Sequence, residues 1–173
     1  MKKMADTGAN WVCISFAGMM NNGSDTNIAW ADKEPNMVTD AEIRRAIDLA
    51  RKNPDANKAG AIVTFTGIVR GYTHEGKEVE KLEMQAYDEL AEKALEKISA
   101  ELRAKKGVVD AIVHHLVGSF DVGEDLVYVV VLADSRRNAF STAQEAVERY
   151  KKEVAVWKKE YLKNGSSYWV KEQ

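Results

Sequence analysis

Two pairs of lysines stand seven residues apart near the end of the chain, in the stretch "YKKEVAVWKKEY" at residues 150–161. If a helix continues through this stretch, Lys151 and Lys158 return to within about 20° of one direction and lie roughly 10 Å apart along the axis. Lys152 and Lys159 then form a parallel pair that is shifted toward solvent. Such a row could bind an anion or transfer a proton. Lysines beside an apolar stripe usually only solubilise a helix, however, and spacing alone favours that interpretation.

Arginines upstream change this balance. "ADSRRNAF" places Arg136 and Arg137 where an apolar strand gives way to a helix, and "TGIVRGYT" places Arg70 at the end of another apolar strand. The N-terminus of a helix offers free backbone N–H groups, so arginines there suit a phosphate or a carboxylate. The three arginines, with the lysine-rich helix nearby, predict an anion pocket.

The segments that must position these residues alternate between strand and helix patterns. β-branched and aromatic residues predict strands at 60–70, 79–87, 108–118, 125–134 and 166–170. Periodic apolar residues predict helices at 39–53, 88–107 and 138–154. Thr39 is expected to cap the first helix, which should stop before Pro54. The mixed order, with a hairpin between strands, predicts an α+β fold.

Length and composition limit the possible classes. The 173 residues suffice for one domain with a sizeable core, and the net charge of −2 gives no overall attraction to nucleic acid or to a membrane. No segment is long enough to span a bilayer. Cys13 stands alone, which excludes an internal disulfide and a cysteine-based metal cluster and fits a reducing, cytoplasmic setting; we expect it to be a small buried hydrophobe. Residues 1–38 are interpreted as an extension containing a strand or an arm, and residues 39–173 as the domain.

Blocks of sequence from about Thr39 to Val170 resemble the large, catalytic subunit of molybdopterin synthase, the MoaE family. The blocks are "GAIVTFTGIVR", "LEMQAY" before a helix, "HHLVGSFDVGEDLVYV", "SRRNAF", "YKKEVAVWKKE" and the closing "YWV". They follow the family order over most of the chain. Their joint occurrence is specific, although no single block is.

The resemblance implies a fold, a reaction and partners. The fold is an α/β-hammerhead with an associated antiparallel β subdomain. The reaction, in molybdenum cofactor biosynthesis, converts cyclic pyranopterin monophosphate into molybdopterin. Sulfur comes from the C-terminal thiocarboxylate of a small ubiquitin-like carrier subunit that ends in Gly-Gly. The large subunits form a homodimer with one carrier at each end, a heterotetramer, and no metal or cofactor is expected in the site.

By the same resemblance, Lys151 and Lys158 match the two lysines of the family's site. We expect Lys151 to act as the acid or base, or to contact the carrier tail, and Lys158 to stabilise charge; the roles could be exchanged. Arg70 and Arg136 suit bidentate contacts to phosphate. The expected substrate-binding residues are Ile68, Val69, Arg70, Ser135, Arg136, Lys151, Lys158, Lys159 and Glu160.

Four positions depart from the family pattern. Ser135 stands where the family usually has histidine, Leu116 where it has arginine, and Gln85 where an acid is common. Ala155 replaces a proline, so the helix is expected to run on and to carry Lys158 in another orientation. These changes bear on activity more than on the fold.

The remaining candidates have mainly structural interpretations. His114 and His115 are adjacent on a predicted strand, so they point to opposite faces and cannot simply share a metal; a packed or hydrogen-bonded His115 is favoured. His74 is expected in a loop without partners. Trp157 and Trp169 are interpreted as core or interface anchors, although Trp157 could also contact the substrate.

Two other functions stay open. A relative that still binds the carrier but has lost catalysis would explain Ser135 and Ala155, and carrier binding without product would favour it. An α+β oligomer that binds another anionic metabolite would explain the Arg and Lys cluster alone. Affinity for an unrelated phosphate, without binding of any Gly-Gly-tailed partner, would favour the second function.

Overall fold

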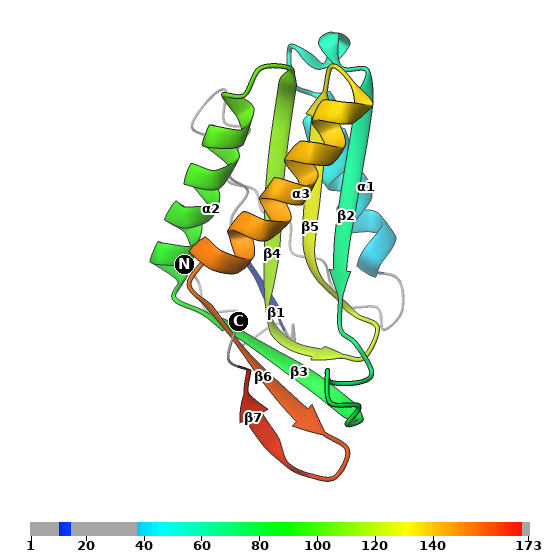
Figure 1. Cartoon of the computed structure of the whole chain (residues 1–173), viewed down its shortest axis with the longest axis vertical. Coiled ribbons are helices and arrows are strands. Elements are labelled where there is room, and N and C mark those ends of the chain that lie inside the picture. Colours follow the sequence, from blue (N-terminus) through cyan, green and yellow to red (C-terminus); the bar gives the residue numbers. More distant parts are fainter. Residues whose placement is uncertain (1–10, 15–37, 171–173) are drawn as a thin grey trace.

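The protein is described here by a computed structural model covering residues 11–14 and 38–170 (Figure 1). Its strands are β1 (Trp11–Ile14), β2 (Ala61–Ile68), β3 (Val79–Ala86), β4 (Val108–Asp121), β5 (Asp125–Ala133), β6 (Val156–Leu162) and β7 (Ser167–Trp169). Its helices are α1 (Val38–Arg51), α2 (Asp88–Arg103), α3 (Arg136–Glu153) and the short 3₁₀ helix η2 (Ala56–Lys58). The described strands form one antiparallel sheet in the order β2-β5-β4-β3-β6-β7, and β1 pairs with β4.

Strand β5 shows how the upper half of the sheet is held together. In Figure 1, α2 and α3 lie in front of the sheet and α1 lies behind it. Val129 and Val131 pack against α2 and α3, whereas Val130 and Leu132 pack against α1. A strand covered on both faces needs a continuous apolar run, which "LVYVVVLA" provides. Burying each such side chain contributes about 1.5–3 kcal/mol.

Strand β4 joins this half to a smaller antiparallel unit. Its first part pairs with β5, and its end, residues 118–121, pairs with β3. Strand β3 then pairs with β6, and β6 with β7. Figure 1 shows this unit crossing below the helices. The arrangement confirms an α+β fold with an antiparallel β subdomain.

Most predicted elements are found close to their expected bounds. Helix α1 begins at Val38, so Thr39 lies inside the helix and not at its N-cap position; the helix ends before Pro54, as expected. Helix α3 begins slightly earlier than expected because Ser135 is its N-cap and accepts a hydrogen bond from the backbone N–H of Asn138.

The expectation that the last helix runs on past Ala155 is wrong. Helix α3 ends at Glu153, and Val154 already has an extended backbone with φ −90° and ψ 130°. The β-branched side chains of Val154 and Val156 favour an extended chain, and β6 pairs with β3. The backbone N–H of Tyr87 also donates to the carbonyl of Ala155 at 3.2 Å. This helix therefore ends without a proline.

Strand β1 is the described part of the predicted extension. Trp11 pairs with Gly118 of β4, and Ile14 with His115. The other predictions for residues 1–37, and the one for the Cys13 side chain, fall outside what the structure describes. None of the described helices is long and apolar enough to cross a membrane.

Candidate active site

Strand β6 places Lys158 and Glu160 on one face, which we call the inner face of β6. Lys158 pairs with Met84 of β3, and Glu160 with Leu82, and both β3 side chains are buried. Glu160 is only 7% exposed, and a carboxylate at that depth needs partners. Its Oε1 lies 3.5 Å from the Nζ of Lys158, and its Oε2 accepts a hydrogen bond from the Tyr168 hydroxyl at 2.5 Å.

Lys159 lies on the opposite, outer face of β6, because successive side chains of a strand alternate. Its Nζ lies over the rings of Tyr161 and Trp169, 4.9 Å and 5.7 Å from their centroids. The Tyr161 hydroxyl donates to Glu83 at 2.6 Å, and this bond, with one from a neighbouring glutamine, lowers the pKa of Glu83. The segment that was predicted to line one pocket is therefore divided between two faces.

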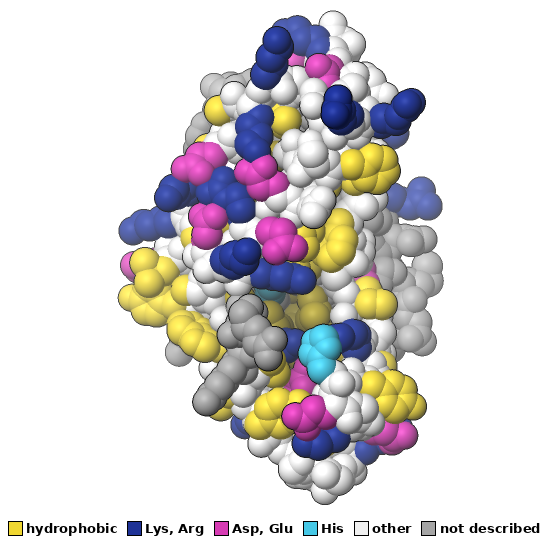
Figure 2. Space-filling view, viewed as in Figure 1, with side chains coloured by type: hydrophobic (Ala, Val, Ile, Leu, Met, Phe, Trp, Pro, Cys, Tyr) yellow, Lys and Arg dark blue, Asp and Glu magenta, His cyan; other side chains and the backbone are white. Residues whose placement is uncertain are grey.

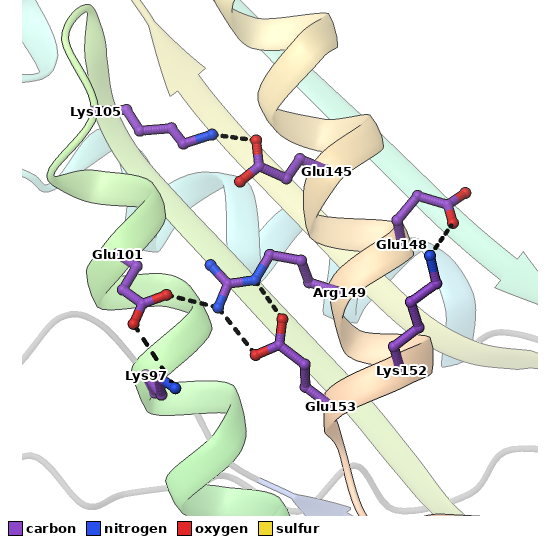
Figure 3. A network of polar contacts seen from close by, with 8 residues as sticks. All are labelled: Lys97, Glu101, Lys105, Glu145, Glu148, Arg149, Lys152 and Glu153. Atoms are coloured by element: carbon purple, nitrogen blue, oxygen red, sulfur yellow. Dashed lines mark hydrogen bonds and ion pairs between the residues drawn. The ribbon is translucent and has the colours of Figure 1, made fainter.

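Lys151 lies in the last turn of α3 and is exposed. Its side chain makes no hydrogen bond or ion pair with residues 38–170. Its neighbours do, as Figure 3 shows: Lys152 pairs with a glutamate one turn earlier at 3.8 Å, and Arg149 donates to Glu153 and to Glu101 of α2, each at 2.6 Å. These hydrogen bonds raise the pKa of Arg149. They connect the last turns of α3 to α2. The ammonium group of Lys151 takes no part in these contacts.

The two lysines flank the turn between α3 and β6. Figure 2 shows a hollow on this face of the molecule, below the end of α3. Lys and Arg side chains lie above the hollow, and a histidine lies at its lower rim with another basic side chain beside it. The loop between β2 and β3 lies on that lower side in Figure 1. The hollow is the candidate active site.

Arg70 lies in this loop and is exposed. Its Nη2 lies 3.0 Å from the Nε2 of His74, and because a guanidinium can only donate, the histidine nitrogen accepts. The expectation that His74 has no partner is wrong. Val69 is buried, and its N–H and C=O are both hydrogen-bonded to the turn at 123–124, so its backbone is not free to bind a ligand. Ile68 is exposed.

Ser135 and Arg136 lie at the other end of α3. The Ser135 Oγ caps the helix by accepting from the N–H of Asn138 at 3.4 Å. Arg136 and Arg137 are exposed, and their side chains have no partner among the described residues. Arg136 lies about 22 Å from Lys151 along the helix axis. One chain therefore does not bring Arg136 to the hollow, and the predicted pocket of three arginines does not form within it.

His115 is a packed residue, as predicted. It is 2% exposed, its Nδ1 lies 2.9 Å from the carbonyl of Leu116, and its ring meets that of Tyr150 edge-on at 5.7 Å. Burial lowers its pKa to about 4. His114 points to the other face and stacks on Tyr128. Leu116 is buried too, so the departure from the family pattern places an apolar side chain in the core.

The two tryptophans lie on the side of the sheet that carries the outer face of β6, Trp157 on β6 and Trp169 on β7. Trp157 and Trp169 are 53% and 48% exposed, so they are not core anchors of this chain. Their role at an interface stays a prediction. Gln85 pairs with Trp157 across the sheet and donates to Glu83 at 2.7 Å, so this departure from the family pattern also lies away from the inner face.

Tyr168 was missed by the analysis of the sequence. Its hydrogen bond to Glu160 raises its pKa to about 12. The available signal was the Asn-Gly turn between β6 and β7, where Gly165 has φ +83°. A tight hairpin at this point pairs Tyr168 with Glu160, as the structure has it.

The fold and the hollow together define an α+β protein with lysine and arginine side chains around a surface hollow. Residues 38–153 match the model of the MoaE protein family. A molybdopterin synthase catalytic subunit from Pyrococcus abyssi is 40% identical over 131 residues, which cover 76% of this chain and 84% of that relative. The crystal structure of molybdopterin synthase from Staphylococcus aureus is similar with a TM-score of 0.61 and 34% identity, covering 66% of this chain and 82% of that one.

A third relative is longer. A probable molybdopterin synthase from Haloferax volcanii is 40% identical over 138 residues, which cover 79% of this chain but only 51% of that protein. The chain thus spans about half the length of this relative. The extent of the family match and the identity to the Pyrococcus protein show that the chain belongs to the MoaE family. The predicted fold class is confirmed by the likeness to the solved structure.

Proposed function

We propose that this chain is the catalytic subunit of a molybdopterin synthase, a sulfurtransferase of molybdenum cofactor biosynthesis. Its substrate is cyclic pyranopterin monophosphate, and its sulfur donor is the C-terminal thiocarboxylate of a small ubiquitin-like carrier. The observation that carries the proposal is that Lys151 is exposed in the last turn of α3, Lys158 lies on β6, which follows directly, and Arg70 is exposed in the loop between β2 and β3.

Each of these cations suits a different task. Arg70 is exposed and is contacted by His74, so it can hold the substrate phosphate in a bidentate contact. Lys158 is held by the buried carboxylate of Glu160, which suits a fixed positive charge that stabilises the transition state. Lys151 has no described side-chain partner, which suits a group that exchanges a proton or contacts the carrier tail.

The reaction requires these tasks twice, once for each sulfur. In each transfer the thiocarboxylate sulfur forms a bond to a carbon of the pterin side chain, and a carbon–oxygen bond at that carbon breaks. One of the two displaced oxygens leaves on the phosphate, and the other leaves as water. Water then adds to the acyl carbon, and the carrier leaves as a carboxylate. The cyclic phosphate opens, and its leaving oxygen takes up a proton. No oxidant or reductant is needed, so acid–base groups and fixed charges are sufficient.

A second copy of the chain would complete the pocket, because Arg136 lies too far from Lys151 in one chain. Two observations favour an interface near Arg136. Phe140, one turn further along α3, is 65% exposed. Strand β2 is an edge of the sheet, has no charged residue over its length and exposes Ile62. Such an edge is usually covered.

Mixing two variants tests this arrangement. Arg136→Ala and Lys151→Ala should each be nearly inactive. If Arg136 serves the site of the other copy, mixed dimers contain one intact site, and random exchange restores about a quarter of the parent activity. If both residues served the same chain, the mixture would stay inactive, and the shared pocket would be wrong.

The alternative of a carrier-binding relative without catalysis keeps one supporting observation. The Ser135 hydroxyl is engaged as the N-cap of α3, where the family usually has histidine. Incubation with thiocarboxylated carrier and cyclic pyranopterin monophosphate separates the two functions. Molybdopterin formation supports the enzyme. A stable complex with the carrier and no product supports the alternative.

A further inference from the structure

A chain of contacts reaches Lys158 from the last strand of the protein. We propose that Tyr168 is a positioning residue for Lys158 and acts through Glu160. The inference rests on the proposed function in one respect, the role of Lys158 as a site lysine. The match to the family model ends at Glu153, before β6 and β7 begin.

Strand β7 and the residue after it are linked to Lys158 in two ways, through the Lys158 backbone and through Glu160. The N–H of Val170 donates to the carbonyl of Lys158 at 2.7 Å. Two residues earlier, Tyr168 pairs with Glu160 across the β6–β7 ladder and donates to its Oε2 at 2.5 Å. The other oxygen of Glu160 lies 3.5 Å from the Nζ of Lys158. Tyr168 is thus one carboxylate away from the ammonium group.

The two carboxylate oxygens of Glu160 face different groups, and this arrangement affects Lys158. A buried carboxylate is stabilised by every donor it can reach, so without Tyr168 it would turn fully toward the ammonium group. The observed 3.5 Å is longer than an N–H···O hydrogen bond, which is usually about 2.7–3.2 Å. Tyr168 therefore keeps Glu160 at a distance that attracts Lys158 and leaves its N–H groups free for a substrate anion.

The surroundings keep the Tyr168 hydroxyl protonated. Its pKa is raised to about 12, first by the hydrogen bond to Glu160, then by burial and by the charges of Glu160 and Glu75, while Thr73 acts weakly in the opposite direction. Thr73 and Glu75 belong to the loop that also carries Arg70. The pKa of Tyr168 thus responds both to the loop that carries Arg70 and to the strand that carries Lys158.

The outer face of β6 supplies a matched control. There the Tyr161 hydroxyl donates to Glu83 at 2.6 Å, an interaction of the same chemistry in the same small sheet. It lies on the face away from Lys158. Phe in place of either tyrosine keeps the ring and removes one hydroxyl, so both variants should fold. Only Tyr168→Phe should affect Lys158.

The experiment uses two readouts on the full-length protein. The first is the single-turnover rate of molybdopterin formation with a thiocarboxylated carrier. The second needs no activity: brief acylation with acetic anhydride, followed by mass spectrometry, gives the labelling of Lys158 relative to Lys159 in the same molecule. Thermal unfolding checks that each variant is folded.

Tyr168→Phe should lower the turnover rate about tenfold, the effect of one hydrogen bond, and should lower the ratio of Lys158 to Lys159 labelling, because Glu160 then holds the ammonium group more closely. Tyr161→Phe should change neither readout. Glu160→Gln removes the charge that faces Lys158 and should raise the labelling ratio. A ratio that falls in Tyr168→Phe and rises in Glu160→Gln would indicate positioning of Lys158. A general destabilisation of β6 would change the ratio in the same direction in both variants.

The outcomes separate this inference from the proposed function. If Tyr168→Phe and Tyr161→Phe behave alike in the labelling ratio, Tyr168 has no positioning role and the inference fails, whatever the turnover rate. If the parent forms no molybdopterin but the ratio falls only in Tyr168→Phe, the positioning of Lys158 stands and the proposed enzyme activity fails.

Discussion

The two faces of β6 carry the same kinds of side chain in different surroundings. On the inner face, Lys158 is paired with a glutamate that is almost fully buried. On the outer face, Lys159 lies over the rings of Tyr161 and Trp169, which are partly exposed. The difference shows that two lysines adjacent in sequence need not share a site. The ammonium group of Lys158 is held in place because its partner, Glu160, is buried, whereas the partners of Lys159 are partly exposed.

The two adjacent histidines of β4 also lie in different surroundings. His115 is packed against Tyr150 of α3, and its pKa is lowered by burial, whereas His114 stacks on Tyr128 on the other face. Alternation along a strand thus separates both pairs of like neighbours. The following predictions test how far the separation extends to activity and stability.

The largest contrast is expected between the two lysines of β6. Lys158→Ala should lower the single-turnover rate of molybdopterin formation by about 100-fold or more, as the loss of a preorganised charge does. Lys159→Ala should stay within a few-fold of the parent. Equal losses in the two variants would show that the faces of β6 are not functionally distinct.

The buried histidine should make stability depend on pH. The ordinary pKa of His115, 6.5, is restored on unfolding, so between pH 6.5 and about 4 the unfolded chain takes up a proton that the folded chain does not. The stabilisation is complete above pH 6.5 and is lost as the pH falls, by up to about 3 kcal/mol.

Urea unfolding across this range should show a weaker pH dependence in His115→Gln than in the parent. The exposed His74→Gln control should follow the parent, and a His115→Gln curve parallel to the parent would contradict the prediction.

The outer face should make only a small contribution to stability. The pKa of Glu83 is lowered, first by the hydrogen bond from Tyr161, so its contribution is present above its ordinary pKa of 4.5 and is lost as the pH falls below that value. Glu83→Gln should cost less than about 1 kcal/mol of unfolding free energy at pH 7, because the group is partly exposed. The difference in unfolding free energy between Glu83→Gln and the parent should be smaller at pH 3.5 than at pH 7. A difference that grows in acid would mean that the carboxylate is not the stabilising form.

The strands and helices could be predicted because their signals are local. The apolar run of β5 and the apolar stripe of α2 each specify an element from nearby residues. The end of α3 was misjudged because absence of a proline was taken to mean continuation. The β-branched Val154 and Val156 pointed to an extended chain, and pairing with β3, a contact distant in sequence, decided the outcome.

The site was only partly predictable for a topological reason. Arg70 and Arg136 each follow a strand, and strand ends that meet at one edge would bring them together. Strands β2 and β5 are antiparallel, however, so their carboxyl ends lie at opposite edges of the sheet. Likewise, the separation of Lys158 from Lys159 follows only once β6 is known to be a strand. The Tyr168 contact required the hairpin register.

The most direct test of the proposed function compares the parent with Lys151→Ala and Lys152→Ala in single-turnover formation of molybdopterin from cyclic pyranopterin monophosphate and thiocarboxylated carrier. Lys152 is the matched control, because it is the neighbouring exposed lysine and is already paired with Glu148. Product from the parent and from Lys152→Ala, with a loss of several kcal/mol of transition-state stabilisation in Lys151→Ala alone, is the predicted result. No product from the parent while the carrier remains bound would contradict the account and leave a docking protein on this fold.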